Sequence, residues 1–192
     1  MGRTRTFDER DVVRAARGVF WANGYADTAI PQLERATGLH RSSIYHGFGS
    51  KRGLFDAAVA SYLSEVVRPL IAPLQAAEVS PTALLDYLRA LRAAMASPAH
   101  PIAQHGCLLI NAAAASARDD DALRAVVRDY RAELAAAIAA GVDARHPTLG
   151  GPARANLAST CTAHVIAAMS LVRTDPAAAL ELLGSAIDAA RG

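Results

Sequence analysis

The chain has 192 residues, of which 52% are hydrophobic, and its formal net charge is +2. This apolar fraction is too high for a disordered chain, and two cysteines are too few for a disulfide framework. No charged segment followed by an apolar run opens the sequence, and the longest apolar stretches are interrupted by polar residues, so we expect a cytoplasmic protein without a membrane partner.

Positive charge is concentrated at the N-terminal end of the sequence. Residues 1–53 contain nine Lys and Arg against five Asp and Glu, a net of +4, whereas residues 54–192 have a net of −2. A basic end on a slightly acidic chain suggests that this end meets a polyanion. Chance fluctuation in a short segment would produce the same numbers, so the charge alone leaves both interpretations open.

Helical periodicity dominates the whole sequence, with Gly and Pro between the periodic segments. Neither a run of alternating β-branched residues nor an Asn-Gly hairpin signal is present. The pattern predicts about nine helices, at residues 8–23, 29–37, 41–47, 51–68, 82–96, 106–118, 120–140, 153–172 and 176–190. We therefore expect an all-α fold.

The second and third predicted helices, with Gly38 between them, form a helix-turn-helix pattern. Leu39, Ile44 and Phe48 are spaced to point inward from the third helix. The residues left for its outer face are Arg41, Ser42, Ser43, Tyr45 and His46. Small polar, aromatic and basic side chains suit contacts with base edges and phosphates, which makes this helix a candidate reader of the major groove.

The segment from Gly24 to Tyr62 resembles the DNA-binding domain of the tetracycline-repressor (TetR) family of transcriptional regulators. The matching residues are Gly24, Tyr25, Thr28, Ala36, Gly38, Leu39, Ile44, Tyr45, His46, Phe48, Ser50, Lys51 and Leu54. The resemblance implies a three-helix DNA-binding domain over residues 1–53 and a helical ligand-binding and dimerisation domain over residues 54–192. It further implies a repressor that binds a palindromic, double-stranded DNA operator as a homodimer and is released by a small-molecule effector.

The resemblance also assigns roles to single residues of the N-terminal domain. Thr28 would cap the second helix and contact a phosphate, which suits the free N–H groups of a helix N-terminus. Tyr45 and Lys51 would contact phosphates, while Ser42, Ser43 and His46 would face bases. His40 stands where a Ser cap is usual, and a phosphate contact is its alternative role. Arg41 belongs to the same DNA-contacting face, and Arg3 and Arg5 could reach DNA as an arm, if they are not simply disordered.

An effector pocket in the C-terminal domain needs apolar walls and a few convergent polar groups. The candidates are polar or soft residues on otherwise apolar helices: Tyr62, Tyr87, Met95, His105, Cys107, Asn111, His164 and Met169. Plain core packing is the alternative role for each of them. For dimerisation, the resemblance implies an interface built from residues 120–140 and 153–172, the second of which carries small residues.

Cys107 admits a second function on the same scaffold. It lies near a predicted helix N-terminus and beside His105, and both features lower the pKa of a thiol. A regulator that senses electrophiles or oxidants would use such a group, whereas a buried, inert cysteine is the other interpretation.

Two other functional classes find little support. The sequence has no Gly-x-Ser-x-Gly elbow, phosphate-binding glycine loop or paired-histidine motif, so we expect no enzyme, no catalytic residue, no cofactor and no metal. A protein-interaction module on a helix-turn-helix scaffold is the third class, and the polar outer face of the third helix argues against it.

Overall fold

The computed structural model describes residues 8–116 and 120–192, and every regular element within them is a helix. The chain forms two compact units, Met1–Val67 and Arg68–Gly192. Nine of the described helices have eight or more residues, which confirms the predicted all-α fold and helix number. The boundary between the units falls after Val67, so residues 54–67 pack with the N-terminal unit. The division of functions between residues 1–53 and residues 54–192 stays a prediction.

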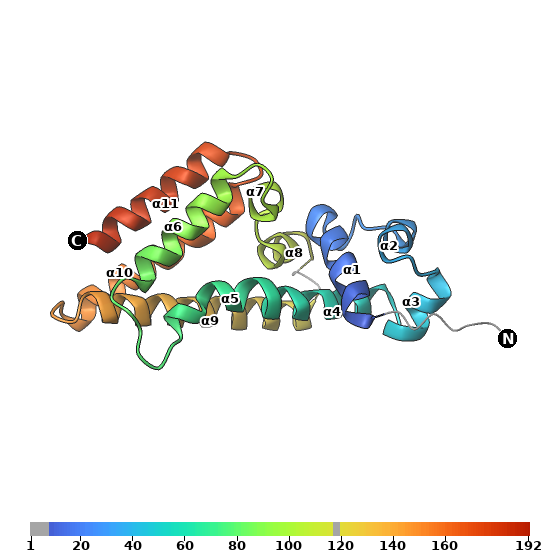
Figure 1. Ribbon diagram of the computed structural model, residues 1–192, viewed down its shortest axis with the longest axis horizontal. Coiled ribbons are helices and arrows are strands. Elements are labelled where there is room, and N and C mark those ends of the chain that lie inside the picture. The colour runs from blue at the N-terminus through green and yellow to red at the C-terminus, as the bar shows by residue number, and fades with distance from the viewer. Residues whose placement is uncertain (1–7, 117–119) are drawn as a thin grey trace. The chain divides into compact units, whose positions relative to one another are not determined.

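The N-terminal unit consists of four helices followed by a π-helical turn (Figure 1). These are α1 (Glu9–Asn23), α2 (Ile30–Thr37), α3 (Arg41–Phe48), α4 (Lys51–Tyr62) and the turn η1 (Leu63–Val67). The buried residues of α1 recur at helical spacing and pack on α4, where Phe20 meets Phe55 with ring centroids 5.2 Å apart and Trp21 meets Tyr62 at 5.0 Å. One apolar core therefore holds the helix-turn-helix.

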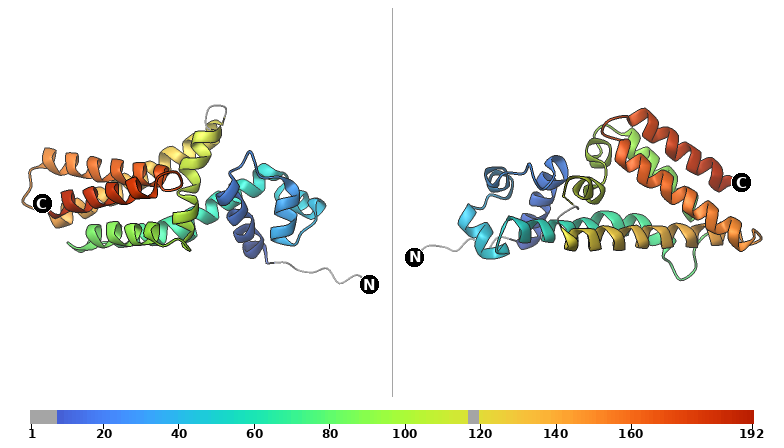
Figure 2. Two further views of the ribbon diagram at one scale, coloured as in Figure 1. Left: turned by 90° about the horizontal axis from the view of Figure 1, so that it is seen from above. Right: turned by 180° about the vertical axis from the view of Figure 1, so that it is seen from behind.

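Helices of very different length make up the second unit. They are α5 (Arg68–Ile71), the 3₁₀ turn η2 (Ala72–Leu74), α6 (Ala83–Ala96), α7 (Pro101–His105), α8 (Leu108–Ser116), α9 (Asp121–Arg145), α10 (Gly151–Leu171) and α11 (Pro176–Arg191). Helix α11 packs against both α6 and α10, and α10 also packs against α9 (Figure 2).

Three predicted boundaries are wrong. Helical structure continues past Pro69 to Leu74, because the π-helical turn before Pro69 changes the hydrogen-bonding pattern at the point where the proline lacks a donor. Helix α9 runs on to Arg145 through Gly141, where a Cβ atom would lie 2.6 Å from Leu74 Cδ2 and 3.0 Å from Leu84 Cβ. That glycine serves close packing and does not end the helix. The third error lies between the predicted helices at residues 82–96 and 106–118, where the structure has the short helix α7 (Pro101–His105).

The helical run from Lys51 to Leu74 is long and apolar enough, by length and composition alone, to pass a test for membrane-spanning segments. It is the only such run among the residues that the structure describes. Its residues Leu54, Phe55, Ala58, Val59 and Tyr62 are buried in the protein core. Of the most apolar 18-residue stretch in this run, 33% is buried inside the protein.

Candidate DNA-binding surface

Helix α3 presents the face that the sequence predicts. Ile44 is fully buried, whereas Arg41, Ser42 and His46 are exposed and Ser43 and Tyr45 are half-buried. Leu39 and Phe48, which we expected to point inward, are half-buried. The guanidinium carbon of Arg41 lies 5.2 Å from the centroid of the Tyr45 ring, so these two side chains stack on the same face. Polar and basic groups of α3 are therefore accessible to a polyanion.

The N-terminus of α3 is capped by a residue that the sequence does not single out. The N-cap residue His40 makes no side-chain cap bond. Instead, Glu34 of α2 accepts a hydrogen bond from the backbone N–H of Arg41 through Oε1 at 2.6 Å. A carboxylate at this position suits the positive end of the helix dipole, and it joins α2 to α3.

Removal of this cap is expected to destabilise the unit. Glu34→Ala leaves the Arg41 N–H without its acceptor, which costs about 1 kcal/mol and lowers Tm by about 2 to 4 °C in a chain of this size. Glu34→Gln retains an acceptor oxygen and is the matched control. Differential scanning calorimetry of both variants measures the effect, and equal Tm values for Glu34→Ala and the unmodified protein would show that the bond contributes nothing.

Thr28 does not cap α2. The N-cap residue is Ala29, and the Gln32 side chain accepts from the Ala29 N–H at 2.7 Å. Thr28 is only 1% exposed, and its hydroxyl donates to the carbonyl of Gly24 at 2.5 Å. The predicted cap is wrong because this hydroxyl closes the loop between α1 and α2. A phosphate contact by Thr28 stays a prediction, and Arg3 and Arg5 lie outside the described residues.

Lys51 begins α4 and turns toward the loop between α1 and α2. Its Nζ lies 4.6 Å from the centroid of the Tyr25 ring and donates to the carbonyl of Ala26 at 3.4 Å. Partial burial lowers the pKa of Lys51 below its ordinary value, against a smaller opposing effect of Asp27. The ammonium group is thus fixed between two parts of the unit.

A close corner joins α3 to α4. The Ser50 hydroxyl caps α4 by accepting from the Gly53 N–H at 3.0 Å. A Cβ atom at Gly53 would lie only 2.0 Å from the carbonyl oxygen of Phe48, which belongs to the last turn of α3. Because that atom is backbone, any side chain at position 53 would force the two helices apart.

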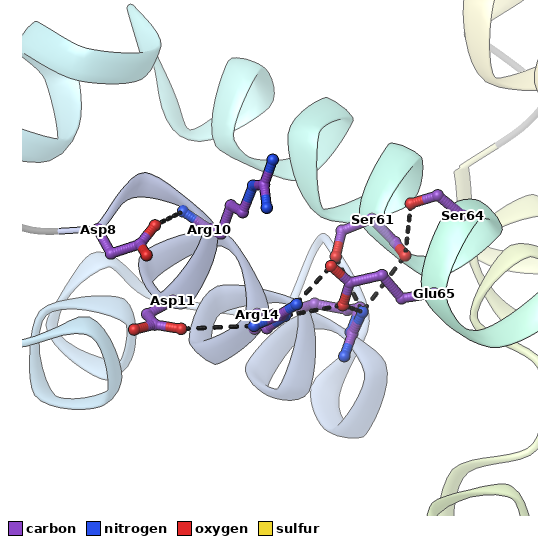
Figure 3. Close-up of polar contacts among 8 residues, drawn as sticks. Asp8, Arg10, Asp11, Arg14, Ser61, Ser64 and Glu65 are labelled. Atoms are coloured by element: carbon purple, nitrogen blue, oxygen red, sulfur yellow. Dashed lines mark hydrogen bonds and ion pairs between the residues drawn. The ribbon is translucent and has the colours of Figure 1, made fainter.

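An ion-pair cluster ties α1 to the π-helical turn η1 (Figure 3). Arg14 Nε donates to Glu65 Oε2 at 2.9 Å, and Arg17 Nη1 donates to the same oxygen at 2.8 Å. Arg17 also donates to the Ser61 hydroxyl at 2.8 Å. Hydrogen bonds from the two arginines lower the pKa of Glu65 to about 2.

This cluster predicts an acid-dependent loss of stability. Since the pKa of Glu65 falls from 4.5 to about 2 on folding, its stabilising effect is complete above pH 4.5 and is lost as the pH falls toward 2. Glu65→Gln is expected to lower Tm at pH 7 and to have a smaller effect at pH 3. Thermal unfolding followed by circular dichroism measures both values, with Glu181→Gln on α11 as the control. A Tm difference that is equal at the two pH values would contradict this account.

The predicted effector residues are divided between the two units, and their role in a pocket stays a prediction. Tyr62 belongs to the N-terminal unit, where its ring packs on Trp21, and the other seven lie in the second unit. Tyr87, Met95, Cys107 and Met169 are buried. His164 is half-buried and bonds the Thr160 carbonyl of its own helix at 2.8 Å. Two surface hollows of the second unit, one between α6 and α11 and one between α9 and α10, are lined by other residues.

A smaller group of these residues surrounds the start of α8. Cys107 is 0% exposed, and its Sγ lies 3.8 Å from the hydroxyl of Tyr130, a residue that the sequence analysis missed. Burial, with a further effect of Cys107, raises the pKa of Tyr87. Asn111 donates to the His105 carbonyl at 2.7 Å.

Burial and the nearby Arg173 lower the pKa of His105 below its ordinary value. Both effects disfavour an imidazolium beside Cys107, and a reactive thiol at this position stays a prediction.

Comparison with known proteins identifies the fold and the family. Residues 12–58 match the family model described as bacterial regulatory proteins, tetR family. The chain is 33% identical over 111 residues to the HTH-type transcriptional repressor ComR of Escherichia coli, which covers 57% of this chain and 51% of ComR. It is 34% identical over 117 residues to the uncharacterized HTH-type transcriptional regulator YezE of Bacillus subtilis, covering 59% and 57% of the two chains. These matches span about half the length of the two relatives.

Solved structures match over nearly the whole chain. A TetR transcriptional regulator from Chloroflexus aurantiacus is 30% identical, with a TM-score of 0.73 over 94% of this chain and 90% of that one. A cysteine mutant of the TetR family regulator CifR, in complex with a 26 bp double-strand operator DNA, is 26% identical, with a TM-score of 0.81 over 100% and 99% of the chains. The family match includes the helix-turn-helix described above, and the structural matches continue through the second unit. The chain belongs to the TetR family of DNA-binding transcriptional regulators.

Proposed function

We propose that this regulator is a repressor that binds a palindromic operator as a homodimer and is released by a small molecule bound in its second unit. The proposal depends mainly on one observation about α3. Its polar and basic face is accessible, while Ile44 on the opposite side is fully buried and holds the helix in place. Because members of this family are DNA-binding regulators, we expect no enzymatic activity. We place the protein in the cytoplasm, where it can reach DNA.

The α3 face divides into groups for bases and groups for phosphates. Ser42, Ser43 and His46 would face base edges, where small serine side chains allow the helix to approach closely. Arg41, His40, Tyr45 and Lys51 would contact phosphates on either side of the groove. Thr28 lies just before α2, and its hydroxyl already donates to the Gly24 carbonyl. Its proposed phosphate contact would therefore be made at the start of α2.

The related proteins support this choice. CifR is described in complex with double-strand operator DNA, and ComR is named a transcriptional repressor. Their likeness to this chain, together with the α3 face, favours operator binding and repression over other uses of a helix-turn-helix.

A mobility-shift assay on the DNA upstream of the protein's own coding sequence tests operator binding. We expect a retarded band at low salt that fades as salt rises, because each phosphate contact releases counterions. A thermal-shift screen for stabilising compounds then supplies candidate effectors, and an effector must weaken the retarded band, since ligand and DNA favour different states. No retarded band at low salt would count against the proposal.

Helices α9 and α10 are the proposed dimer interface. A shallow hollow between them is lined mainly by small side chains: Arg131, Ala135, Ala139, Ala155, Ala158, Ser159, Thr162, Ala163 and Ile166. Small residues let a partner helix approach closely, and burial of this surface in a second copy would offset the cost of association. Two α3 helices related by a two-fold axis would then meet two operator half-sites.

A charge in this interface is expected to separate the dimer. Ala163→Glu would take a carboxylate out of water in the proposed interface, and therefore the variant should run as a monomer in size-exclusion chromatography with light scattering and should lose operator affinity. Ala189→Glu places the same charge on an exposed position of α11 and is the control. If the Ala163→Glu protein stayed dimeric and bound DNA normally, the dimer interface would not lie at this position.

Sensing of electrophiles or oxidants through Cys107 is the alternative function. It has a defined thiol beside the Tyr130 hydroxyl, but that thiol is fully buried. Burial shields it from reagents, so reversible binding of an effector is the better-supported release mechanism. Cys107→Ser distinguishes the two, because only a thiol sensor would lose its response to a reactive compound.

A further inference from the structure

Lys51 is the only lysine in the sequence, against nineteen arginines. Its ammonium group lies over the face of the Tyr25 ring at 4.6 Å and bonds the Ala26 carbonyl at 3.4 Å. Among the residues that the structure describes, no carboxylate forms an ion pair with this ammonium, and the charge of Asp27 affects its pKa less than burial does. The positive charge is therefore held in place without being neutralised.

The ring that holds this charge is itself fixed. The Tyr25 centroid lies 4.9 Å from that of Phe55 and 6.3 Å from that of Phe20, and both phenylalanines are almost completely buried. Tyr25 thus extends the aromatic core of the unit to the surface where α4 begins. A cation on the face of such a ring is attracted by its quadrupole.

We propose that Tyr25 is a positioning residue for DNA binding: its ring holds the Lys51 ammonium beside the N-terminus of α4, aimed at a DNA phosphate. This inference rests on the proposed phosphate contact of Lys51. A free lysine side chain loses much rotational freedom when it binds, and a prearranged one loses less. One ammonium donor goes to Ala26, and the remaining donors are available for phosphate oxygens.

Progressive fluorination of the ring at position 25 tests the inference, because it weakens the ring quadrupole and leaves the shape of the side chain nearly unchanged. Tyr25→Phe removes the hydroxyl, and 4-fluoro-, 3,5-difluoro- and 3,4,5-trifluorophenylalanine at position 25 then weaken the ring quadrupole in steps. Each full-length protein is titrated by fluorescence anisotropy with one labelled duplex of arbitrary sequence at low salt, because phosphate contacts do not depend on sequence. The same series is made in a Lys51→Met background, and circular dichroism monitors folding.

Affinity is expected to stay within about twofold for Tyr25→Phe and to fall by about fivefold across the fluorinated series. Lys51→Met alone should weaken binding about tenfold and flatten the salt dependence by about one unit of slope. In the Lys51→Met background the fluorinated series should have no effect.

Three results would overturn the inference. If fluorination lowered DNA affinity equally with and without Lys51, Tyr25 would be a structural residue only. If fluorination left the affinity unchanged in the presence of Lys51, the ring would have no role in positioning the ammonium. Unchanged DNA affinity of Lys51→Met would show that Lys51 makes no phosphate contact, although the protein still binds DNA. If the unmodified protein bound no duplex at low salt, the proposed function would fail first, so the two failures are distinguishable.

Discussion

Ser42→Glu is expected to weaken operator binding by about a hundredfold or more while Tm and helix content stay the same. Ser42 is exposed on α3, so a longer side chain can extend into solvent. In a complex, the new carboxylate would replace a base contact worth about 1 to 3 kcal/mol and would face phosphates, where a like charge costs several kcal/mol more. Fluorescence anisotropy with the upstream duplex measures the loss.

The matched control for this experiment is Ser185→Glu, which adds the same charge at an exposed position of α11. It should leave DNA affinity within about twofold, because screening at physiological salt removes most long-range effects. If Ser42→Glu and Ser185→Glu weakened binding equally, net charge rather than the α3 face would explain the result.

Ile44→Ala is expected to cost about 2 to 5 kcal/mol of the free energy of unfolding and to abolish operator binding. Ile44 is 0% exposed and is the one fully buried side chain of α3. Truncation leaves a cavity beneath the helix, and since Ile44 is the one buried residue of this eight-residue helix, the orientation of α3 depends strongly on it. Urea unfolding followed by circular dichroism gives the free energy.

A graded control accompanies this variant. Ile44→Val removes a single methylene group and should cost about 0.5 to 1.5 kcal/mol, with DNA binding retained. An Ile44→Ala protein of normal stability that still bound the operator would show that α3 does not depend on this anchor.

The sequence predicts the helices and the orientation of α3 because both follow from local periodicity. The positions of Ile44 inside and of Arg41, Ser42 and His46 outside are confirmed. Local patterns could not predict the Glu34 cap, since its acceptor and donor belong to different helices. The same reason hides the contact between Tyr25 and Lys51, whose signal in the sequence is only an aromatic residue and a lone lysine.

The C-terminal unit was harder to predict in detail. Gly141 has the sequence character of a helix end, and only the approach of Leu74 and Leu84 shows why it stays within α9. Cys107 and Tyr130 meet across 23 residues of sequence, beyond the range of any spacing rule. The effector residues chosen by polarity fall in both units, Tyr62 in the first and the other seven in the second.

Protection of guanine N7 atoms from dimethyl sulfate tests the central claim most directly, because N7 lies in the major groove. With the unmodified protein bound to its upstream duplex, we expect two protected patches whose centres are about 10 base pairs, or one helical turn, apart, or a multiple of that spacing. The Ser42→Glu protein should give no protection. A stable complex that leaves every N7 reactive would contradict the placement of α3 in the major groove.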